Sequence, residues 1–355
     1  MVKLMLDNGA DVESLATIPH QGYRAISVSS KGPWKANALQ LACEQNDTII
    51  VKMLLNHGAK VSAPASSKAS TLDYAISFGT PVNLQLLLNE GNDISAHEVG
   101  EVGWLERSGD DTGIVRILFE HATSGQLSDP SIRRKLLTRA AWLAAPGTDT
   151  QLLQKILKDD VDRDARDKSG NTLLSVAAYF KDLAVMRVLV EQGADINAQN
   201  NNGTSALHHS AYRDNLEAAK FLLENGADVN CLGQCPISWI RGSEMYDTVL
   251  AIAAARGLPN LVKLLLQHNA DVNSASQNSQ GCSALEAAVH GGNGKVVQAL
   301  IDAGAGVLSD GVHEDMWRKA ISVASRDKHP SEILGILQKG YKDALQNCSE
   351  RRAKG

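Results

Sequence analysis

The sequence of 355 residues has few aromatic side chains, few cysteines and no long apolar run. Aromatic residues make up 4% of the chain and hydrophobic residues 43%, so its core must be mainly aliphatic. Five cysteines are too few, and odd in number, for the disulfide framework of a secreted protein. No run approaches the roughly 18 to 20 apolar residues that span a bilayer, and residues 1–7 turn acidic before a signal-peptide core could form. We therefore expect an intracellular protein, cytoplasmic or nuclear, without membrane insertion.

The chain also lacks an excess of basic residues. Its 35 lysines and arginines stand against 40 aspartates and glutamates, which gives a formal net charge of -5. A protein with this charge has no sequence-independent attraction to nucleic acid or to an anionic membrane surface. We therefore expect no nucleic-acid partner.

One ten-residue pattern recurs along the chain. Residues 188–197 read Val-Leu-Val-Glu-Gln-Gly-Ala-Asp-Ile-Asn, and the pattern returns at 221–230, 33 residues later, and at 264–273. The glycine position of the pattern falls, in the same register, at Gly9, Gly58, Gly91, Ala122, Asp160, Gly193, Gly226, Asn269, Gly304 and Gly340. A period of this size is the signature of a solenoid, in which each unit contacts only its neighbours. One linear array therefore replaces the two or three globular domains that the length alone suggests.

Each unit of the repeat combines helical runs with stop signals. Residues 216–223 carry apolar side chains at helical spacing, and Gly226 follows where a helix end needs a left-handed backbone. Each unit also has a second stop signal. In the unit that ends at Asn269 this signal is Gly257, which separates a short alanine-rich segment from the amphipathic run that follows it. A stretch rich in turn residues precedes that segment. The predicted unit is a tight turn, a short helix, a second helix and an outgoing loop.

These features resemble the ankyrin repeat. The likeness is clearest at 167–198 and 200–230, and residues 203–208, Gly-Thr-Ser-Ala-Leu-His, stand where the family has Gly-x-Thr-Pro-Leu-His. The family's proline is missing from this position, which should weaken helix initiation without changing the fold. The resemblance implies an all-α solenoid of about nine to ten units, some of them degenerate. It also implies a non-catalytic scaffold or adaptor that binds a protein partner through a concave surface of turn tips and first helices.

The register of the repeat predicts how the chain is organised. The predicted segments are a partial first repeat at 1–12, a loop insertion at 13–37, the array at 38–345 and a frayed tail at 346–355. Within the array we expect degenerate units around 97–165, a loop insertion at about 231–247 and a C-terminal cap at about 312–345. Because Met1 falls inside the second helix of a unit, the alternative is the recognition segment of a larger signalling receptor, truncated at an internal methionine. A degenerate first cap would also explain this start.

No residue pattern indicates catalysis, a cofactor or a metal. Residues 291–295, Gly-Gly-Asn-Gly-Lys, lack the flanking residues of a phosphate-binding loop. Cys231 and Cys235 could be half of a zinc site, yet no second pair of ligands follows at the usual spacing. Asp159 and Asp160 have no acid–base partner and are expected to cap a helix or to face solvent. We expect no enzyme, no cofactor and no small-molecule substrate; an enzyme or metal protein is the less favoured alternative.

The candidate binding residues lie at variable positions of the units. Tyr179 and Phe180 occupy the position in one unit that Tyr212 and Arg213 occupy in the next, so stacking should bring them together. Aromatic residues and arginine are enriched in interface hot spots. The alternative is that one or more of these rings packs between repeats, and that the tryptophans of the insertions only cover the solenoid. The predicted protein-binding residues are Tyr179, Phe180, Tyr212, Arg213, Phe78, Arg256, Asn201, Asn202, Trp34 and Trp239.

Overall fold

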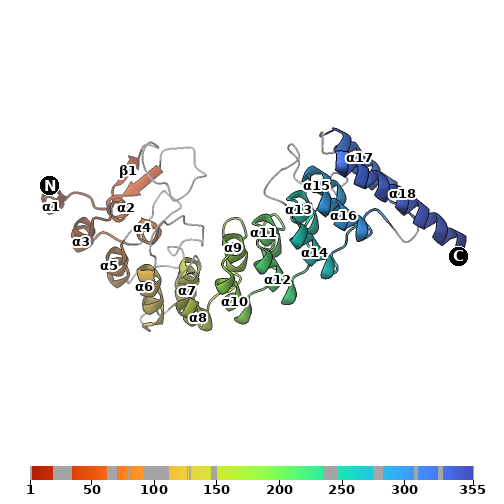
Figure 1. Ribbon diagram of the computed structural model, residues 1–355. Helices are drawn as coiled ribbons and strands as arrows, with labels where there is room; N and C mark the ends of the chain where they lie inside the picture. Colours follow the sequence, from red (N-terminus) through yellow and green to blue (C-terminus); the bar gives the residue numbers. More distant parts are fainter. Residues whose placement is uncertain are drawn as a thin grey trace. The chain divides into compact units, whose positions relative to one another are not determined.

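The structure is a computed structural model, and two compact units of the chain, residues 1–168 and 169–355, are treated separately (Figure 1). The described residues are 2–18, 34–61, 70–78, 80–90, 112–125, 127, 129–144, 150–234, 246–274, 283–307, 311–326 and 331–354. Almost all their regular structure is helical, and two short antiparallel hairpins supply the strands.

The elements follow one another as helix pairs. In the first unit they are α1 (Val2–Asp7), β1 (Leu15–Ile18), β2 (Trp34–Asn37), α2 (Ala38–Glu44), α3 (Thr48–Asn56), α4 (Thr71–Phe78), α5 (Pro81–Glu90), α6 (Thr112–Thr123), α7 (Pro130–Ala144) and α8 (Thr150–Lys158). In the second unit they are α9 (Leu173–Phe180), α10 (Leu183–Glu191), α11 (Ala206–Tyr212), α12 (Leu216–Glu224), β3 (Leu232–Gln234), β4 (Tyr246–Thr248), α13 (Val249–Ala255), α14 (Pro259–Gln267), α15 (Ala284–His290), α16 (Gly294–Asp302), α17 (Glu314–Arg326) and α18 (Ser331–Lys354).

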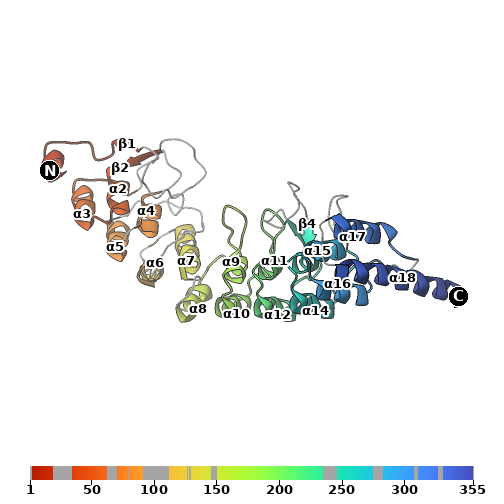
Figure 2. The same cartoon turned by 45° about the horizontal axis from the view of Figure 1, so that its top comes forward.

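Within residues 169–355 the helices stack in two rows (Figures 1 and 2). The first helices α9, α11, α13, α15 and α17 each contact the next, and so do the second helices α10, α12, α14, α16 and α18. Within residues 1–168, α2 packs on α4 and α3 packs on α5 in the same way. The buried side chains are mostly Leu, Val, Ile and Ala, as the shortage of aromatic residues requires. The structure confirms the predicted all-α solenoid of helix pairs.

Polar caps begin the first helices in place of the missing proline. At α11 the Ser205 N–H donates to Nδ1 of His208 at 3.2 Å, and His208 is buried. At α2 the side chains of Asn37 and Gln40 each accept from the other's backbone N–H. Such a cap satisfies N–H groups that have no partner in the helix and contributes about 1 kcal/mol. The same N-cap position is filled at α9, α13 and α15 by Thr172, Thr248 and Ser283.

Of the predicted stop positions that the structure describes, all but Ala122, Asp160 and Gly340 have a left-handed backbone. Gly226 has a φ of 91° and Asn269 a φ of 62°. Ala122, in contrast, lies inside α6, and the left-handed residue there is Gly125, three positions later, with a φ of 77°. Gly340 lies inside α18. The predicted register is therefore wrong at Ala122 and Gly340, where longer helices replace the standard unit.

The asparagine of each outgoing loop joins one unit to the next. Asn197 Oδ1 accepts from the Asp228 N–H at 2.8 Å, and its Nδ2 donates to the Gly226 carbonyl at 3.2 Å. Asn230 and Asn273 make the same pair of bonds to the loops that follow them. These amides therefore clip successive loops together. Local side-chain bonding would have confined each amide to its own turn.

Removal of one clip should destabilise the second unit without unfolding it. Asn273 accepts from the Gly306 N–H at 2.7 Å and donates to the carbonyls of Gly304 at 3.2 Å and Val307 at 3.0 Å. Asn273→Ala leaves these groups unpaired, so we expect the free energy of unfolding to fall by about 1–3 kcal/mol. Asn202→Ala, at an exposed turn position, is the matched control and should change it by less than about 0.5 kcal/mol. Equal effects of the two substitutions in urea titrations would contradict the clip.

A buried ion pair links α4 to α7 in residues 1–168. Arg139 Nη2 lies 3.4 Å from Asp73 Oδ1, and the two side chains are only 5% and 9% exposed. Asp73 Oδ2 also accepts from the backbone N–H of Ser70 at 3.0 Å. Burial lowers the pKa of Arg139, and the charge of Asp73 opposes that shift. Each charge therefore depends on the other for compensation.

Both predicted insertions contain a short hairpin. β1 pairs with β2, and β3 pairs with β4, each in antiparallel register. The residues between the paired strands, 19–33 and 235–245, lie outside the described part of the chain. The predicted contact residue Trp239 lies there too, as does the side chain of Trp34. Their predicted role in binding stays a prediction.

The last helix pair extends further than expected. α17 and α18 pack together beside Trp317, which is 1% exposed and donates from Nε1 to the Gly306 carbonyl at 3.3 Å. α18 continues to Lys354, past the predicted end of the cap at 345. The predicted frayed tail at 346–355 is therefore wrong as far as Lys354. The reason is that residues 346–354 contain neither glycine nor proline to stop a helix.

Candidate functional site

Aromatic or cationic residues stand at the last position or at the C-cap of three successive first helices. Tyr179 and Phe180 are the last residues of α9. Tyr212 is the last residue of α11 and is followed by its C-cap, Arg213, while Arg256 is the C-cap of α13. Because α9, α11 and α13 stack in one row, these five side chains come from adjacent units. We call Tyr179, Phe180, Tyr212, Arg213 and Arg256 the aromatic–arginine ladder.

Rings and guanidinium groups are in mutual contact within the ladder. Tyr179 and Tyr212 stack with ring centroids 6.2 Å apart and an interplanar angle of 15°. Arg213 Cζ lies 4.7 Å from the centre of the Tyr179 ring, and Arg256 Cζ lies 5.3 Å from that of Tyr212. The Phe180 ring meets Tyr179 edge-on at 5.4 Å. Aromatic and cation–π contacts contribute about 0.5–1.5 kcal/mol each, so the ladder holds its own arrangement.

Part of the ladder is covered by the fold and part faces solvent. Tyr179, Tyr212 and Arg256 are half-buried, and Arg213 is exposed. Phe180 is 50% exposed, although it is one of only four phenylalanines in the chain. The packing alternative applies to the tyrosines, and the binding role of the ladder stays a prediction. The tyrosines pack on each other between neighbouring units, whereas the phenylalanine presents apolar surface to solvent.

Three further contacts, which the sequence did not suggest, support the ladder. His209, 8% exposed, meets the Tyr179 ring edge-on at 5.7 Å, and the Arg213 Nε donates to the Tyr179 carbonyl at 3.1 Å. Lys181 follows α9 and contacts the unit of α11, where its Nζ donates to the Asp214 carbonyl at 3.2 Å. The sequence did carry a signal for the contact of His209 with the ladder. His209 lies three residues before Tyr212, so the two side chains share one face of the helix.

The predicted turn residues Asn201 and Asn202 lie at the tip of the turn before α11. The Asn201 N–H donates to the Ser169 carbonyl at 3.0 Å, and the Asn202 N–H donates to Asn200 Oδ1 at 2.9 Å. Both side chains are exposed. A side chain at Gly170 would come within 2.7 Å of the Asn201 backbone nitrogen, so adjacent turn tips are in close contact. The two asparagines therefore occupy an exposed tip that is in close contact with the tip of the preceding turn.

Phe78 belongs to residues 1–168, whereas the ladder belongs to residues 169–355. Phe78 ends α4, in the other compact unit of the chain, and is half-buried. Its ring lies 6.3 Å from that of Tyr74 at an angle of 48°. Its predicted role in binding stays a prediction.

A cysteine, a serine and a histidine meet at the start of α11. Cys231 Sγ lies 3.6 Å from Ser205 Oγ and 3.7 Å from His208 Nδ1. The histidine nitrogen already accepts from a backbone N–H, and burial raises the pKa of the Cys231 thiol, so the cluster does not favour a thiolate nucleophile. Cys235 lies outside the described residues. Across the described ranges, no group of three or more His, Cys, Asp or Glu side chains is placed to hold a metal ion.

Cys43 should resist alkylation in the folded protein. Its side chain is fully buried in α2, and burial raises the pKa of its thiol to about 12. At pH 8 the reactive thiolate is therefore only about one part in ten thousand. We expect iodoacetamide to label Cys43 only after denaturation, as read by peptide mass spectrometry, with Cys348 in α18 as the internal comparison. Rapid native labelling of Cys43 would mean that α2 opens readily.

A cavity lies between α6 and α8 in residues 1–168. Its volume is about 330 Å³, and it is lined by Arg116, Phe119, Glu120, Gln151, Leu152 and Lys155. The lining charges have both signs and include no nucleophile beside a general base. This cavity therefore offers no chemistry that distinguishes it as an active site.

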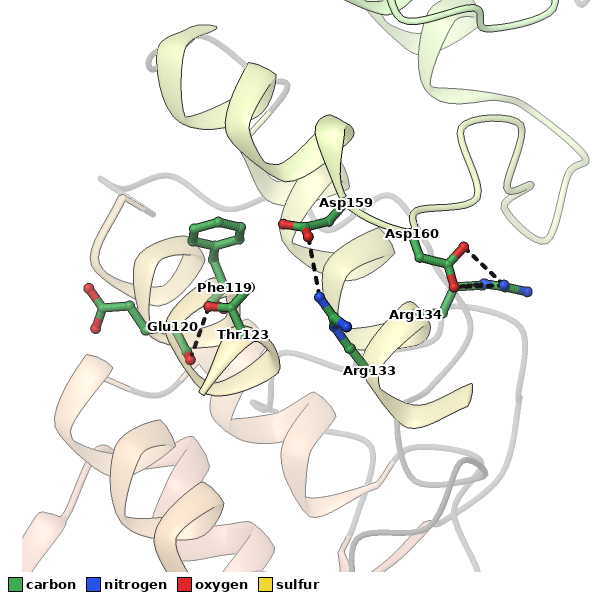
Figure 3. A network of polar contacts seen from close by, with 7 residues as sticks. All are labelled: Phe119, Glu120, Thr123, Arg133, Arg134, Asp159 and Asp160. Carbon is green, nitrogen blue, oxygen red and sulfur yellow. Dashed lines mark hydrogen bonds and ion pairs between the residues drawn. The ribbon is translucent and has the colours of Figure 1, made fainter. Parts of the chain in front are cut away.

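Two ion pairs lie next to this region and involve Asp159 and Asp160. Arg133 Nη2 lies 3.2 Å from Asp159 Oδ1, and Arg134 Nη2 lies 2.7 Å from Asp160 Oδ2 (Figure 3). Asp160 faces solvent, as expected, with a side chain that is 59% exposed, and both aspartates also tie α7 to the end of α8. The Arg134–Asp160 pair is more than half exposed, so it stabilises the fold by less than about 1 kcal/mol.

Comparison with known families agrees with this architecture. Residues 35–66 match the model of the ankyrin repeat, and residues 137–232 and 237–310 match the model of ankyrin repeats in three copies. The chain belongs to the ankyrin repeat family, whose members are typically non-catalytic modules of protein–protein interaction. No curated protein that was compared matches the chain. None of the described helices is both long and apolar enough to cross a membrane.

Proposed function

We propose that the protein is a non-catalytic adaptor of the cytoplasm or nucleus that binds a protein partner through the aromatic–arginine ladder. The ladder itself is the observation that carries the proposal. It gathers the residue types that dominate interface energetics, tyrosine and arginine, and it adds a phenylalanine that is 50% exposed. The exposed ring meets Tyr179, which lies under the Arg213 guanidinium group, so apolar, aromatic and cationic groups adjoin on one surface.

Preorganisation favours binding at this surface. The rings and guanidinium groups are already held by one another, as the 6.2 Å stacking of Tyr179 on Tyr212 shows. A side chain ordered before binding avoids a cost of about 0.5–1.5 kcal/mol when the complex forms. The stacked helices beneath the ladder also supply a stiff support. Affinity would therefore arise from a low ordering cost on the side of this protein.

Affinity purification with three baits tests the proposal. The baits are the wild type, Phe180→Ser/Arg213→Ser in the ladder, and Glu217→Ser/Lys220→Ser on the exposed side of α12 as the matched control. We expect quantitative mass spectrometry to find proteins that the wild type and the control retain and the ladder variant loses. Each such protein is then purified and its Kd measured. Equal retention by all three baits would contradict a binding role for the ladder.

A further inference from the structure

We propose that the ladder binds an acidic, extended segment of its partner, with carboxylates at every third residue. This inference rests on the proposed function and specifies the chemistry of the partner. It is based on a row of three cations, Lys181, Arg213 and Arg256, which are the C-cap residues of α9, α11 and α13. One cation per unit thus follows the stacking direction of the helices. We call these three residues the cation row.

The cation row has no carboxylate partner in the described part of the chain. Lys181 and Arg213 donate to backbone carbonyls of the adjacent unit, and Arg213 and Arg256 lie over tyrosine rings. The nearest acids in sequence are Asp182 and Asp214. Asp182 Oδ1 accepts from the Val185 N–H as the N-cap of α10, and Asp214 has an exposed side chain. Three cationic groups therefore keep N–H donors for an external anion.

Two other surface cations in residues 169–355 have carboxylate partners. Lys220 pairs with Glu224 along α12, and Arg318 pairs with both Glu314 and Asp315 along α17. These side chains are compensated within their own helices. The cation row instead places three cations along one row of helix ends, on a protein whose net charge is -5. Electrostatic steering would therefore bring an acidic partner to the ladder and away from the rest of the surface.

The spacing of the row selects the geometry of the ligand. Packed helices lie about 8–10 Å apart, so successive C-caps of one row repeat at about that distance. A polyproline II segment advances about 3.1 Å per residue with three residues per turn, which puts every third side chain on one face at about 9 Å intervals. An exposed aromatic ring is the usual platform for this conformation, and Phe180, 50% exposed, supplies one beside the row. An acidic residue at every third position of such a segment would meet one cation per unit.

The arrangement favours an acidic peptide over a nucleic acid. A single-stranded nucleic acid binds by stacking its bases on open aromatic faces. Tyr179 and Tyr212 already lie against each other, and each has a guanidinium group over its ring. The negative net charge of the protein also opposes the approach of a polyphosphate. We therefore expect an acidic peptide to bind more tightly than an oligonucleotide.

Fluorescence anisotropy with labelled peptides tests the inference. The probes are a nonapeptide of three Glu-Pro-Pro repeats, its Gln-Pro-Pro and Lys-Pro-Pro counterparts, and a peptide of the same composition with its three glutamates at adjacent positions. We expect the wild type to bind the Glu-Pro-Pro probe about tenfold more tightly than the glutamine probe and more tightly than the respaced probe, with an affinity that falls as salt increases. Arg213→Glu/Arg256→Glu should reverse the preference toward the lysine probe. Lys220→Glu/Lys263→Glu, with the same change of net charge at exposed positions of α12 and α14, should keep the wild-type preference.

The outcomes separate this inference from the proposed function. Three results would overturn the acidic ligand: equal binding of the glutamate and glutamine probes, a Kd of the glutamate probe weaker than about 1 mM, or tighter binding of a 12-nucleotide single strand. If the ladder variant still loses proteins in affinity purification in any of these cases, the proposed function stands without it. If the charge reversal leaves all peptide affinities unchanged, the cation row is not the contact.

Discussion

Replacement of both Tyr179 and Tyr212 by alanine should weaken partner binding by at least about 100-fold. The two rings form the centre of the ladder, and each supports an arginine through a cation–π contact. Their loss removes contact area and also releases Arg213 and Arg256 from their fixed positions. Hot-spot truncations cost about 2 kcal/mol or more each, and about 1.4 kcal/mol corresponds to a tenfold change in Kd. Titration calorimetry with the purified partner measures the effect.

The cost of this double substitution to stability should be moderate. Both tyrosines are half-buried, so we expect the free energy of unfolding to fall by about 1–3 kcal/mol in total. Tyr179→Phe/Tyr212→Phe keeps the rings and should keep most of both stability and binding. A loss of binding that tracks unfolding in every variant, including the phenylalanine pair, would mean that the rings serve the fold alone.

Replacement of Arg139 by methionine should destabilise residues 1–168 by about 3–5 kcal/mol. The substitution leaves the Asp73 carboxylate buried, 9% exposed, without its counter-charge. Removing one partner of a buried pair usually costs this much, because the remaining charge cannot reach water. Methionine has nearly the length of the arginine stem, so packing changes little. Urea denaturation followed by circular dichroism measures the shift.

Two controls distinguish the lost charge from lost packing. Arg134→Ala removes an arginine of the same helix whose partner Asp160 is 59% exposed, and it should cost less than about 1 kcal/mol. Arg139→Met/Asp73→Asn removes both charges and keeps an acceptor for the Ser70 N–H, so it should recover most of the stability of the single variant. If the double variant is no more stable than Arg139→Met, the buried charge is not the cause.

The repeat register predicted most of the fold because each unit needs a left-handed residue to end its second helix. Gly226 and Asn269 end their helices as expected, because few residues adopt a left-handed backbone at low cost. The register failed where a helix outgrew the unit. The spacing predicted a helix end at Ala122, but no glycine stands there. α6 continues past it, toward Gly125. At Gly340 a glycine was present, but close packing against Ile301 explains it without a helix end.

The candidate site was predictable to the extent that it follows from stacking. Tyr179 and Tyr212 are 33 residues apart, one period of the repeat, so the pattern placed them side by side. The pairing of Asp73 with Arg139 was not predictable, since it joins residues across a region where the pattern is degenerate. A buried ion pair leaves no periodic signal in a sequence. The cation row needed the C-cap positions, which propensity alone places only within one or two residues.

Hydrogen–deuterium exchange on the complex with a purified partner tests the central claim most directly. The claim is that the ends of α9, α11 and α13 form the binding surface. We predict that binding slows amide exchange around residues 179–181, 212–214 and 255–257, while the exposed faces of α10, α12 and α14 exchange as in the free protein. Protection confined to those second helices, with unchanged exchange at the ladder, would contradict the account.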